Sequence, residues 1–343
     1  MHRLRPRSVS RFALLATVLS YCLAQTAGAQ DLPSSVSDAL SASTEINQTD
    51  PKKVHVGVYV NQIDSVSLKD SQVTVDFHIW FRWTDPDIKP LETFDIVNGK
   101  IDTKEDVVEQ TMGDVHYACC RVMATIHKLW DVSDFPLDEH MVDIQIEDGE
   151  FEDFKQQYIA DDENCGLNPE AEIAGWALTP EDATVVSHAY NTNYGDVSLP
   201  TGHASNYSRF IYSIKIARPG YGMFIKLFAG LFIAAAISFH ALLIQPSELD
   251  ARFGLAVGAM FAAVASEYIV VSSLPESNYL TLADKLHITT FAFVFISLAV
   301  SVLSAKVSNH GHERLCWWID RAAFVGLTSI YAIFVISEIM LRW

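Results

Sequence analysis

One face of a long apolar segment carries residues whose types and spacing could act on ions inside a membrane. They recur at intervals of three and four residues, so they share one side of a helix. They are Asp250, Gly254, Gly258, Phe261, Ala265, Tyr268 and Ser272. This face has an acid at one end, small residues next and aromatic bulk beyond, so several copies around one axis could line a pore. Tight packing between helices is the alternative explanation of the small residues.

Aromatic side chains close to acids form a second group of candidates. Tyr194 and Tyr207 flank a polar turn, and Phe151 lies in an acidic run. Rings and carboxylates together attract an organic cation through cation–π and ionic interactions. His78 and Trp80 share one face of an alternating segment. The alternatives are that these rings are ordinary core or strand residues, and that His78 is a surface histidine or a proton sensor.

Acidic side chains in the same region could ligate Ca²⁺, which prefers oxygen donors. The candidates are Glu147, Asp148, Glu150 and Asp153. They do not follow the pattern of an EF-hand, and the sequence favours a solvated acidic surface over a calcium site. The chain has no serine-hydrolase elbow, no zinc-protease motif and no phosphate loop. The sequence therefore predicts no enzyme and no cofactor, and it leaves the metal question open.

The distribution of charge divides the chain into an acidic part and a neutral part. Residues 1–29 have a basic start, an apolar stretch and a small-residue cleavage pattern, which predicts a signal peptide followed by an N-terminal arm at 30–50. Residues 30–218 hold 34 acids against 13 Lys and Arg, whereas residues 219–343 hold 8 against 7. An acidic surface argues against a nucleic-acid partner and attracts cations instead.

Residues 51–218 have the period of two that is typical of strands. Alternation begins at Val54 and is strongest over 73–81. Further strands are expected at 121–129, 141–146, 183–190 and 207–217. Many short strands separated by turns predict an antiparallel, immunoglobulin-like β-sandwich. Whether Cys165 forms a disulfide with Cys119 or Cys120 stays open, because the sequence does not define their separation.

Residues 219–343 contain four apolar segments, each long enough to span a lipid bilayer as a helix. They are expected at about 221–244, 250–272, 286–306 and 316–341. Four spans return the C-terminus to the side of the acidic domain. Lys306, Arg314 and Arg321 then lie together on the cytoplasmic side, as the positive-inside rule requires. We therefore expect a multi-pass membrane protein whose first domain lies outside the cytoplasm.

Four motifs in order along residues 51–343 resemble the pentameric ligand-gated ion channels, the Cys-loop receptor superfamily. They are Trp83-Thr84-Asp85-Pro86, Phe135-Pro136-Leu137-Asp138, Arg218 before the first span, and Leu274–Thr281 between the second and third spans. The two cysteines that flank the second motif in animal receptors are replaced by Lys128 and Val142. That pattern is similar to the prokaryotic branch, so the resemblance implies a bacterial inner-membrane protein with a periplasmic first domain.

The resemblance implies a homopentamer around the second span, with a small-molecule site between neighbouring subunits and permeant cations in the pore. The ligand site would use His78, Trp80, Phe151, Tyr194 and Tyr207. The residues that couple the site to the helices would be Leu68, Lys69, Asp70, Asp85, Phe135, Pro136, Asp138, Arg218, Pro275 and Tyr279. The alternatives are a non-conducting, membrane-anchored periplasmic sensor and a channel that is gated by protons or modulated by calcium.

Overall fold

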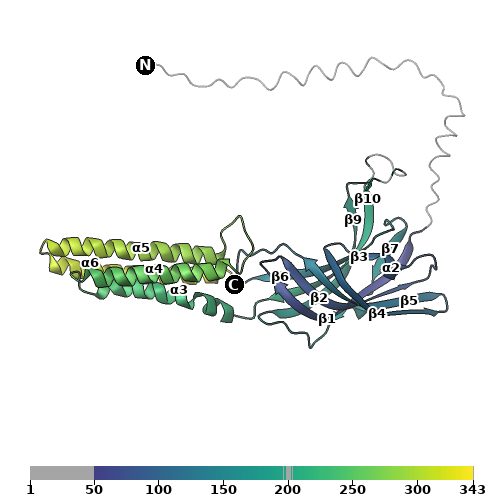
Figure 1. Cartoon of the computed structure of the whole chain (residues 1–343), viewed down its shortest axis with the longest axis horizontal. Helices are drawn as coiled ribbons and strands as arrows, with labels where there is room; N and C mark the ends of the chain where they lie inside the picture. The colour runs from purple at the N-terminus through teal and green to yellow at the C-terminus, as the bar shows by residue number, and fades with distance from the viewer. Residues whose placement is uncertain (1–49, 196, 198–201, 203, 343) are drawn as a thin grey trace, which may run out of the picture. The chain divides into compact units, whose positions relative to one another are not determined.

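The computed structural model describes residues 50–342 apart from 196, 198–201 and 203. The expected signal peptide and all but the last residue of the expected arm lie outside the described residues. The described chain has a region of two β-sheets followed by four long helices (Figure 1).

The two sheets pack face to face as a sandwich. The first sheet has the order β4-β5-β2-β1-β7, with β8 beside β1, and the second has the order β3-β6-β10-β9. The strands of the first sheet are β1 Lys52–Ser67, β2 Gln72–Trp83, β4 Gly99–Met112, β5 Val115–His127, β7 Gln156–Ala160 and β8 Gly166–Leu167. The strands of the second are β3 Phe94–Ile96, β6 Glu139–Asp148, β9 Ala177–Tyr190 and β10 Ser205–Ala217. Two short helices, α2 Pro90–Thr93 and η1 Asp162–Asn164, lie in the connections.

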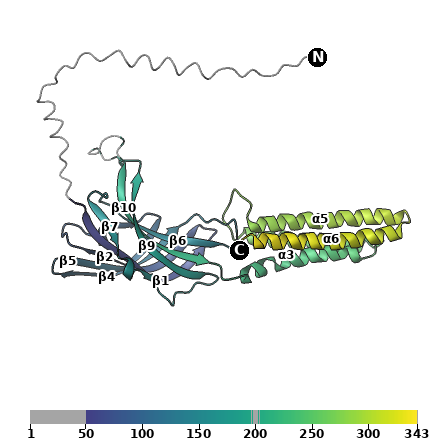
Figure 2. The same cartoon turned by 180° about the vertical axis from the view of Figure 1, so that it is seen from behind.

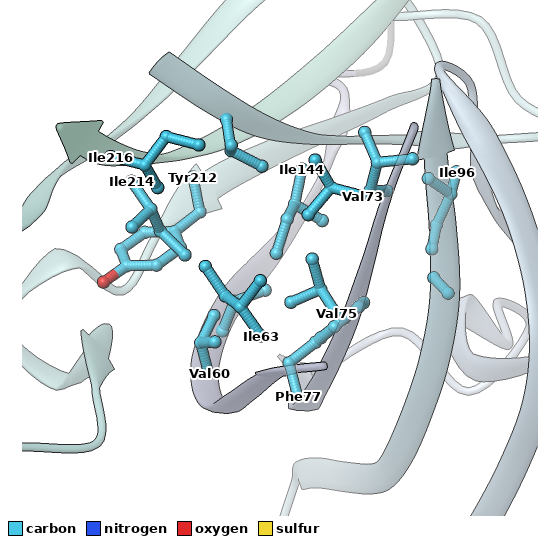
Figure 3. Packing of buried hydrophobic residues seen from close by; sticks show 14 of the residues in the cluster. Val60, Ile63, Val73, Val75, Phe77, Ile96, Ile144, Tyr212, Ile214 and Ile216 are labelled. Carbon is cyan, nitrogen blue, oxygen red and sulfur yellow. The ribbon is translucent and has the colours of Figure 1, made fainter. Parts of the chain in front are cut away.

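The alternation of apolar residues in the sequence explains the core of the sandwich. Successive side chains of a strand point to opposite faces, so every second residue can be buried. Val73, Val75 and Phe77 of β2 are fully buried, as are Ile144 of β6 and Ile214 of β10. Figure 3 shows side chains from both sheets meeting in this core. Burial of such apolar area stabilises the sandwich by roughly 25 cal/mol per Å².

Three details differ from the sequence-based expectation. The sandwich is not purely antiparallel, because β1 pairs in parallel with β7 and β8. Strand β4 was not predicted, since most of its side chains are exposed and it lacks an alternating pattern. The strand expected at 121–129 ends at His127, and Leu129 is exposed.

The four described cysteines are all free, so no disulfide joins Cys165 to Cys119 or Cys120. The Cys165 thiol accepts a hydrogen bond from the backbone N–H of Val58 at 3.4 Å. Burial raises the pKa of this thiol to about 11, which keeps it protonated and unreactive at neutral pH.

Four helices of the described chain are long and apolar enough to cross a membrane. They are α3 Gly222–His240 (extended by η2 Ala241–Leu243), α4 Leu249–Val271, α5 Leu282–Asn309 and α6 Glu313–Met340. They run side by side in both views (Figure 1 and Figure 2). The expected spans match these helices to within a few residues at each end. The start of α5 is defined by a capping box, in which Thr281 and Asp284 satisfy each other's backbone N–H groups. The chain is therefore a multi-pass membrane protein by length and composition of its helices.

Candidate functional site

Three tyrosines of the β9–β10 hairpin surround a hollow at the surface of the second sheet. The hollow has a volume of about 320 Å³ and is lined by Asp95, Val97, Glu147, Asp148, Gly149, Tyr190, Tyr194 and Tyr207. The Tyr190 ring meets Tyr194 edge to face with centroids 5.9 Å apart, and it meets Tyr207 in the same way at 5.8 Å. Tyr194 and Tyr207 were predicted for the ligand site, and the structure brings them together. The electron-rich ring faces and three carboxylates make the hollow suitable for an organic cation.

An internal network holds Tyr190 in place. Arg209 donates from Nε to Glu147 Oε1 at 2.6 Å and from Nη2 to the Tyr190 hydroxyl at 2.8 Å. The Tyr190 hydroxyl in turn donates to Glu147 Oε2 at 3.0 Å. Burial, followed by the Glu147 charge, raises the pKa of Tyr190, and burial also raises the pKa of Tyr207. Both phenols therefore stay neutral near pH 7, as a ring that receives a cation should.

Three of the four acids proposed for calcium, Glu147, Asp148 and Asp153, have protein partners. Asp148 is buried and accepts hydrogen bonds from the Thr93 hydroxyl at 2.6 Å, the Gln156 amide at 2.9 Å and two backbone N–H groups. Glu147 is bound to Arg209, Asp153 accepts from the Ser187 hydroxyl at 2.5 Å, and Glu150 is exposed. Nowhere in the described part of the chain do three or more His, Cys, Asp or Glu side chains form a group able to hold a metal ion.

Phe151 does not line the hollow, although it was predicted for the ligand site. Its ring is half-buried against the hydrophobic core, and its backbone N–H donates to Asp148 Oδ1 at 2.9 Å. The sequence could not distinguish a core residue from a binding residue at this position, because an aromatic residue among acids is consistent with either role. Phe154, the next aromatic residue, is exposed and lies 5.5 Å from the Lys155 ammonium group.

His78 and Trp80 lie on the outer face of the first sheet, whereas Tyr190, Tyr194 and Tyr207 line a hollow on the second sheet. The Trp80 indole donates to Asp161 Oδ2 at 2.9 Å and packs over Gly57, where a Cβ would overlap its ring. His78 Nδ1 lies 3.1 Å from the Asn61 amide oxygen. Burial would raise the pKa of Asp161, but hydrogen bonds from Trp80 and Asn164 outweigh it and leave this pKa lowered. The predicted five-residue site is thus not assembled within one chain.

The predicted face of α4 is exposed over its whole length. All seven of its residues are solvent-accessible, including Phe261 at 71% and Tyr268 at 76%. The opposite side of α4 packs against α3 and α5 through Ala256, Ala259 and Ala263. Small residues therefore lie on both sides of α4, and only those on the opposite side are explained by packing within the chain.

Arg252 anchors the buried side of α4 to α6. Its guanidinium is fully buried and donates to both oxygens of Asp320, from Nη1 at 3.1 Å and from Nη2 at 2.6 Å. It also donates to the carbonyls of Ile244 and Leu242, which follow α3. The step of two residues from Asp250 to Arg252 turns the helix by about 200°, so Asp250 stays on the exposed face.

Tyr279, one of the predicted coupling residues, lies where the β5–β6 loop reaches the helices. The Tyr279 hydroxyl accepts from the backbone N–H of Val132 and donates to Asp131 Oδ1, both at 3.1 Å. The backbone N–H of Leu282 donates to the carbonyl of Ser133 at 2.8 Å. These three contacts join the loop to the connection between α4 and α5 and to the start of α5.

Asp138 and Arg218 form the ionic part of this junction. Their carboxylate and guanidinium groups lie 3.5 Å apart, and both side chains are buried. The Arg218 guanidinium also lies 3.5 Å from the centre of the Trp176 ring. Burial lowers the pKa of Arg218, although Asp138 opposes this effect. His140 Nε2 lies 2.7 Å from the second oxygen of Asp138, so this carboxylate connects Arg218 to strand β6.

The remaining coupling residues differ in position. Phe135 is buried beside Arg218 and precedes Pro136 through a cis peptide bond. In the β1–β2 turn Leu68 is buried, whereas Lys69 and Asp70 are exposed. Pro275 lines a separate surface hollow with Glu267.

Asp85 is a correction to the predicted ionic cluster. It bonds Lys52 at 3.0 Å, at the end of β2 opposite to the β1–β2 turn. Asp85 follows β2, whose twelve residues rise about 3.3 Å each. The length of this strand therefore lies between Asp85 and the end of the sandwich that holds Arg218, so Asp85 does not join the ionic cluster.

Three residues that matter in these sites were not predicted: Asp95, Arg209 and Asp320. Asp95 and Arg209 come from strands distant in the sequence, and only the register of the sheet places them beside Glu147. Asp320 lies near the start of an apolar helix, where an acid could equally face water. An acid inside a span is a usable signal, but the sequence does not identify its partner.

Comparison of the chain with protein-family models and with curated proteins gives no match.

Proposed function

We propose that this chain is one subunit of a homopentameric, ligand-gated and cation-selective channel in a bacterial inner membrane. Its β-sandwich would lie in the periplasm. The observation that carries the proposal is the exposed face of α4, from Asp250 to Ser272. A helix that only anchors a domain has no need for such a face.

The exposed face of α4 differs from that of α6. Val325, Ile330, Ile333 and Ile336 are exposed on α6, and aliphatic side chains suit contact with lipid. The seven predicted residues of α4 instead combine an acid, two glycines, small residues and aromatic rings, although aliphatic side chains such as Leu255 and Val257 are exposed beside them. Five copies of the acid at the end of this face, around a water-filled axis, would concentrate cations.

The two groups of ligand residues also support a pentamer. The tyrosine hollow lies on the second sheet, and His78 and Trp80 lie on the outer face of the first sheet. A neighbouring subunit could bring the second group to the first, which would close a site between subunits. The junction formed by Tyr279, Asp138 and Arg218 would then transmit a change in the sandwich to α4 and α5, provided that the ligand binds one state better than the other.

Electrical recording from the purified protein in planar lipid bilayers tests the proposal. We expect currents during a screen of small organic cations, with a reversal potential in sodium chloride gradients that indicates cation selectivity. Native mass spectrometry in mild detergent should give five subunits.

A chain that remains monomeric after gentle extraction would refute the channel assignment. A pentamer that binds ligands and never conducts would favour the non-conducting sensor instead. Currents that respond only to pH would identify protons as the activator.

A further inference from the structure

The strand register produces an unbalanced row of charges beside the tyrosine hollow. Asp95 on β3 pairs directly with Glu147 on β6, and Glu147 bonds Arg209 on β10. Like charges directly opposite each other in a sheet repel. The row therefore has two carboxylates and one guanidinium, which bonds Glu147, and the unbalanced negative charge lies at the Asp95 end.

The other two carboxylates of the hollow already have strong partners. Both oxygens of Glu147 accept hydrogen bonds, one from Arg209 at 2.6 Å and one from Tyr190 at 3.0 Å. Asp148 accepts from Thr93, Gln156 and two backbone N–H groups. Asp148 thus fills its acceptor sites, and both Glu147 and Asp148 are only 4% exposed, so neither offers a ligand the access that the exposed Asp95 does.

Asp95 is the carboxylate that is available to a ligand. It is exposed at the hollow, and within the described residues its carboxylate accepts one hydrogen bond, from the backbone N–H of Ile96 at 2.8 Å. That bond leaves most of its acceptor capacity unused, since an ionised carboxylate has about four acceptor sites. The rings of Tyr190, Tyr194 and Tyr207 line the same hollow and can hold the apolar or methylated part of a cation.

We infer that Asp95 is the counter-ion for the ammonium group of an organic cation held among Tyr190, Tyr194 and Tyr207. The inference rests on the proposal that this hollow is the ligand site, and it names the residue that sets the charge of the ligand. The cation balances the charge of the second carboxylate in this row, and the tyrosines remain neutral hydrogen-bonding and cation–π partners. Neutral molecules of the same shape would lack the ion pair and bind more weakly.

Binding to the detergent-purified full chain tests this inference with matched probes. The cationic probes are choline and isopentylamine. Their neutral counterparts are the carbon analogue of choline, in which a tert-butyl group replaces trimethylammonium, and isopentyl alcohol. Affinity is measured by calorimetry, and the midpoint of thermal unfolding is recorded with and without each probe.

Wild-type protein should bind at least one cation about tenfold more tightly than its neutral counterpart, and Asp95→Asn should abolish that preference. Asp95→Glu should retain most of it. The unfolding midpoint of Asp95→Asn without probe should equal or exceed that of wild type, because the repulsion with Glu147 is removed. Asp64→Asn removes one exposed acid from the first sheet and should leave binding unchanged.

The inference would be overturned by the absence of any preference for cations in the wild type, or by equal loss of preference in Asp64→Asn and Asp95→Asn. A full preference retained by Asp95→Asn would do the same. Recording of currents separates this inference from the channel proposal. Asp95-dependent binding without current would refute only the channel, whereas currents opened equally by cations in Asp95→Asn would refute only the role of Asp95.

Discussion

Removal of the Asp320 carboxylate should destabilise the helix bundle more than any other single change among the buried polar groups described above. Asp320 is the sole acid bonded to the Arg252 guanidinium within the described residues, and it accepts two of its hydrogen bonds. Asp320→Ala would leave a fully buried cation bonded only to the carbonyls of Leu242 and Ile244. An uncompensated buried charge of this kind costs about 3–5 kcal/mol.

That cost can be expressed as a change in thermal stability. A domain of 150–250 residues loses about 2–4 °C of its unfolding midpoint per kcal/mol. Asp320→Ala should therefore lower the midpoint by about 10 °C. The double variant Arg252→Met with Asp320→Leu removes both charges and fills most of the volume, so it should lose much less, since replacement of a buried pair by apolar residues is often close to neutral.

The assay is the thermal unfolding of wild type, both single variants and the double variant in detergent, followed by tryptophan fluorescence. The four midpoints form a double-mutant cycle, which isolates the interaction between the two side chains. A double variant whose loss equals the sum of the two single losses would refute the argument. So would an Asp320→Ala protein with the midpoint of wild type, because the guanidinium would then have another partner.

Three further predictions concern conduction, coupling and acid stability. A perfectly cation-selective pore has a reversal potential of about 59 mV in a tenfold salt gradient. Asp250→Ala should reduce that reversal potential, and Phe261→Ala should promote opening of the channel. An unchanged reversal potential for Asp250→Ala, or unchanged opening for Phe261→Ala, would remove the role assigned to that residue. Arg218→Ala should impair gating or assembly more than ligand affinity, measured by comparing current amplitudes with calorimetric binding, and wild-type currents would contradict this. The Arg121 hydrogen bond lowers the pKa of Asp76 below 3.8, so this pair stabilises the sandwich fully above that pH and loses its effect as the pH falls through the lowered pKa. Asp76→Asn should therefore cost about 1 kcal/mol at neutral pH, since Arg121 is about half exposed, and nothing in strong acid; a cost independent of pH in fluorescence-monitored unfolding would be the contrary result.

Most strands could be predicted because burial follows a period of two. Val73, Val75, Phe77, Ile79 and Phe81 alternate with more polar residues, and all five are fully buried. Strand β4 escaped prediction because its side chains are largely exposed, so hydrophobicity leaves no periodic signal. The parallel pairing of β1 with β7 was also beyond prediction, since it joins segments about a hundred residues apart.

The candidate sites divide in the same way. The α4 face could be predicted, because its seven residues follow the period of a single helix and its geometry is local. The role inferred for Asp95 could not be predicted from the sequence. It depends on the pairing of Asp95 with Glu147 across two strands and on the ion pair between Glu147 and Arg209. Phe151 was also predicted for the ligand site; its half-buried ring packs on the core and does not line the tyrosine hollow of the same chain.

The sequence by itself determined the division into an acidic sandwich and four apolar helices, and it determined which side of α4 is free of neighbours in the chain. Both follow from the composition and from the periodicity of short stretches of the sequence. Only the tertiary structure decided which carboxylates already have partners. Hydrogen-bond partners such as Glu147 and Arg209, or Arg252 and Asp320, are 62 and 68 residues apart. Asp95 stands out as available to a ligand only after the partners of Glu147 and Asp148 are known. Those partners depend on distance in space and not on spacing along the chain.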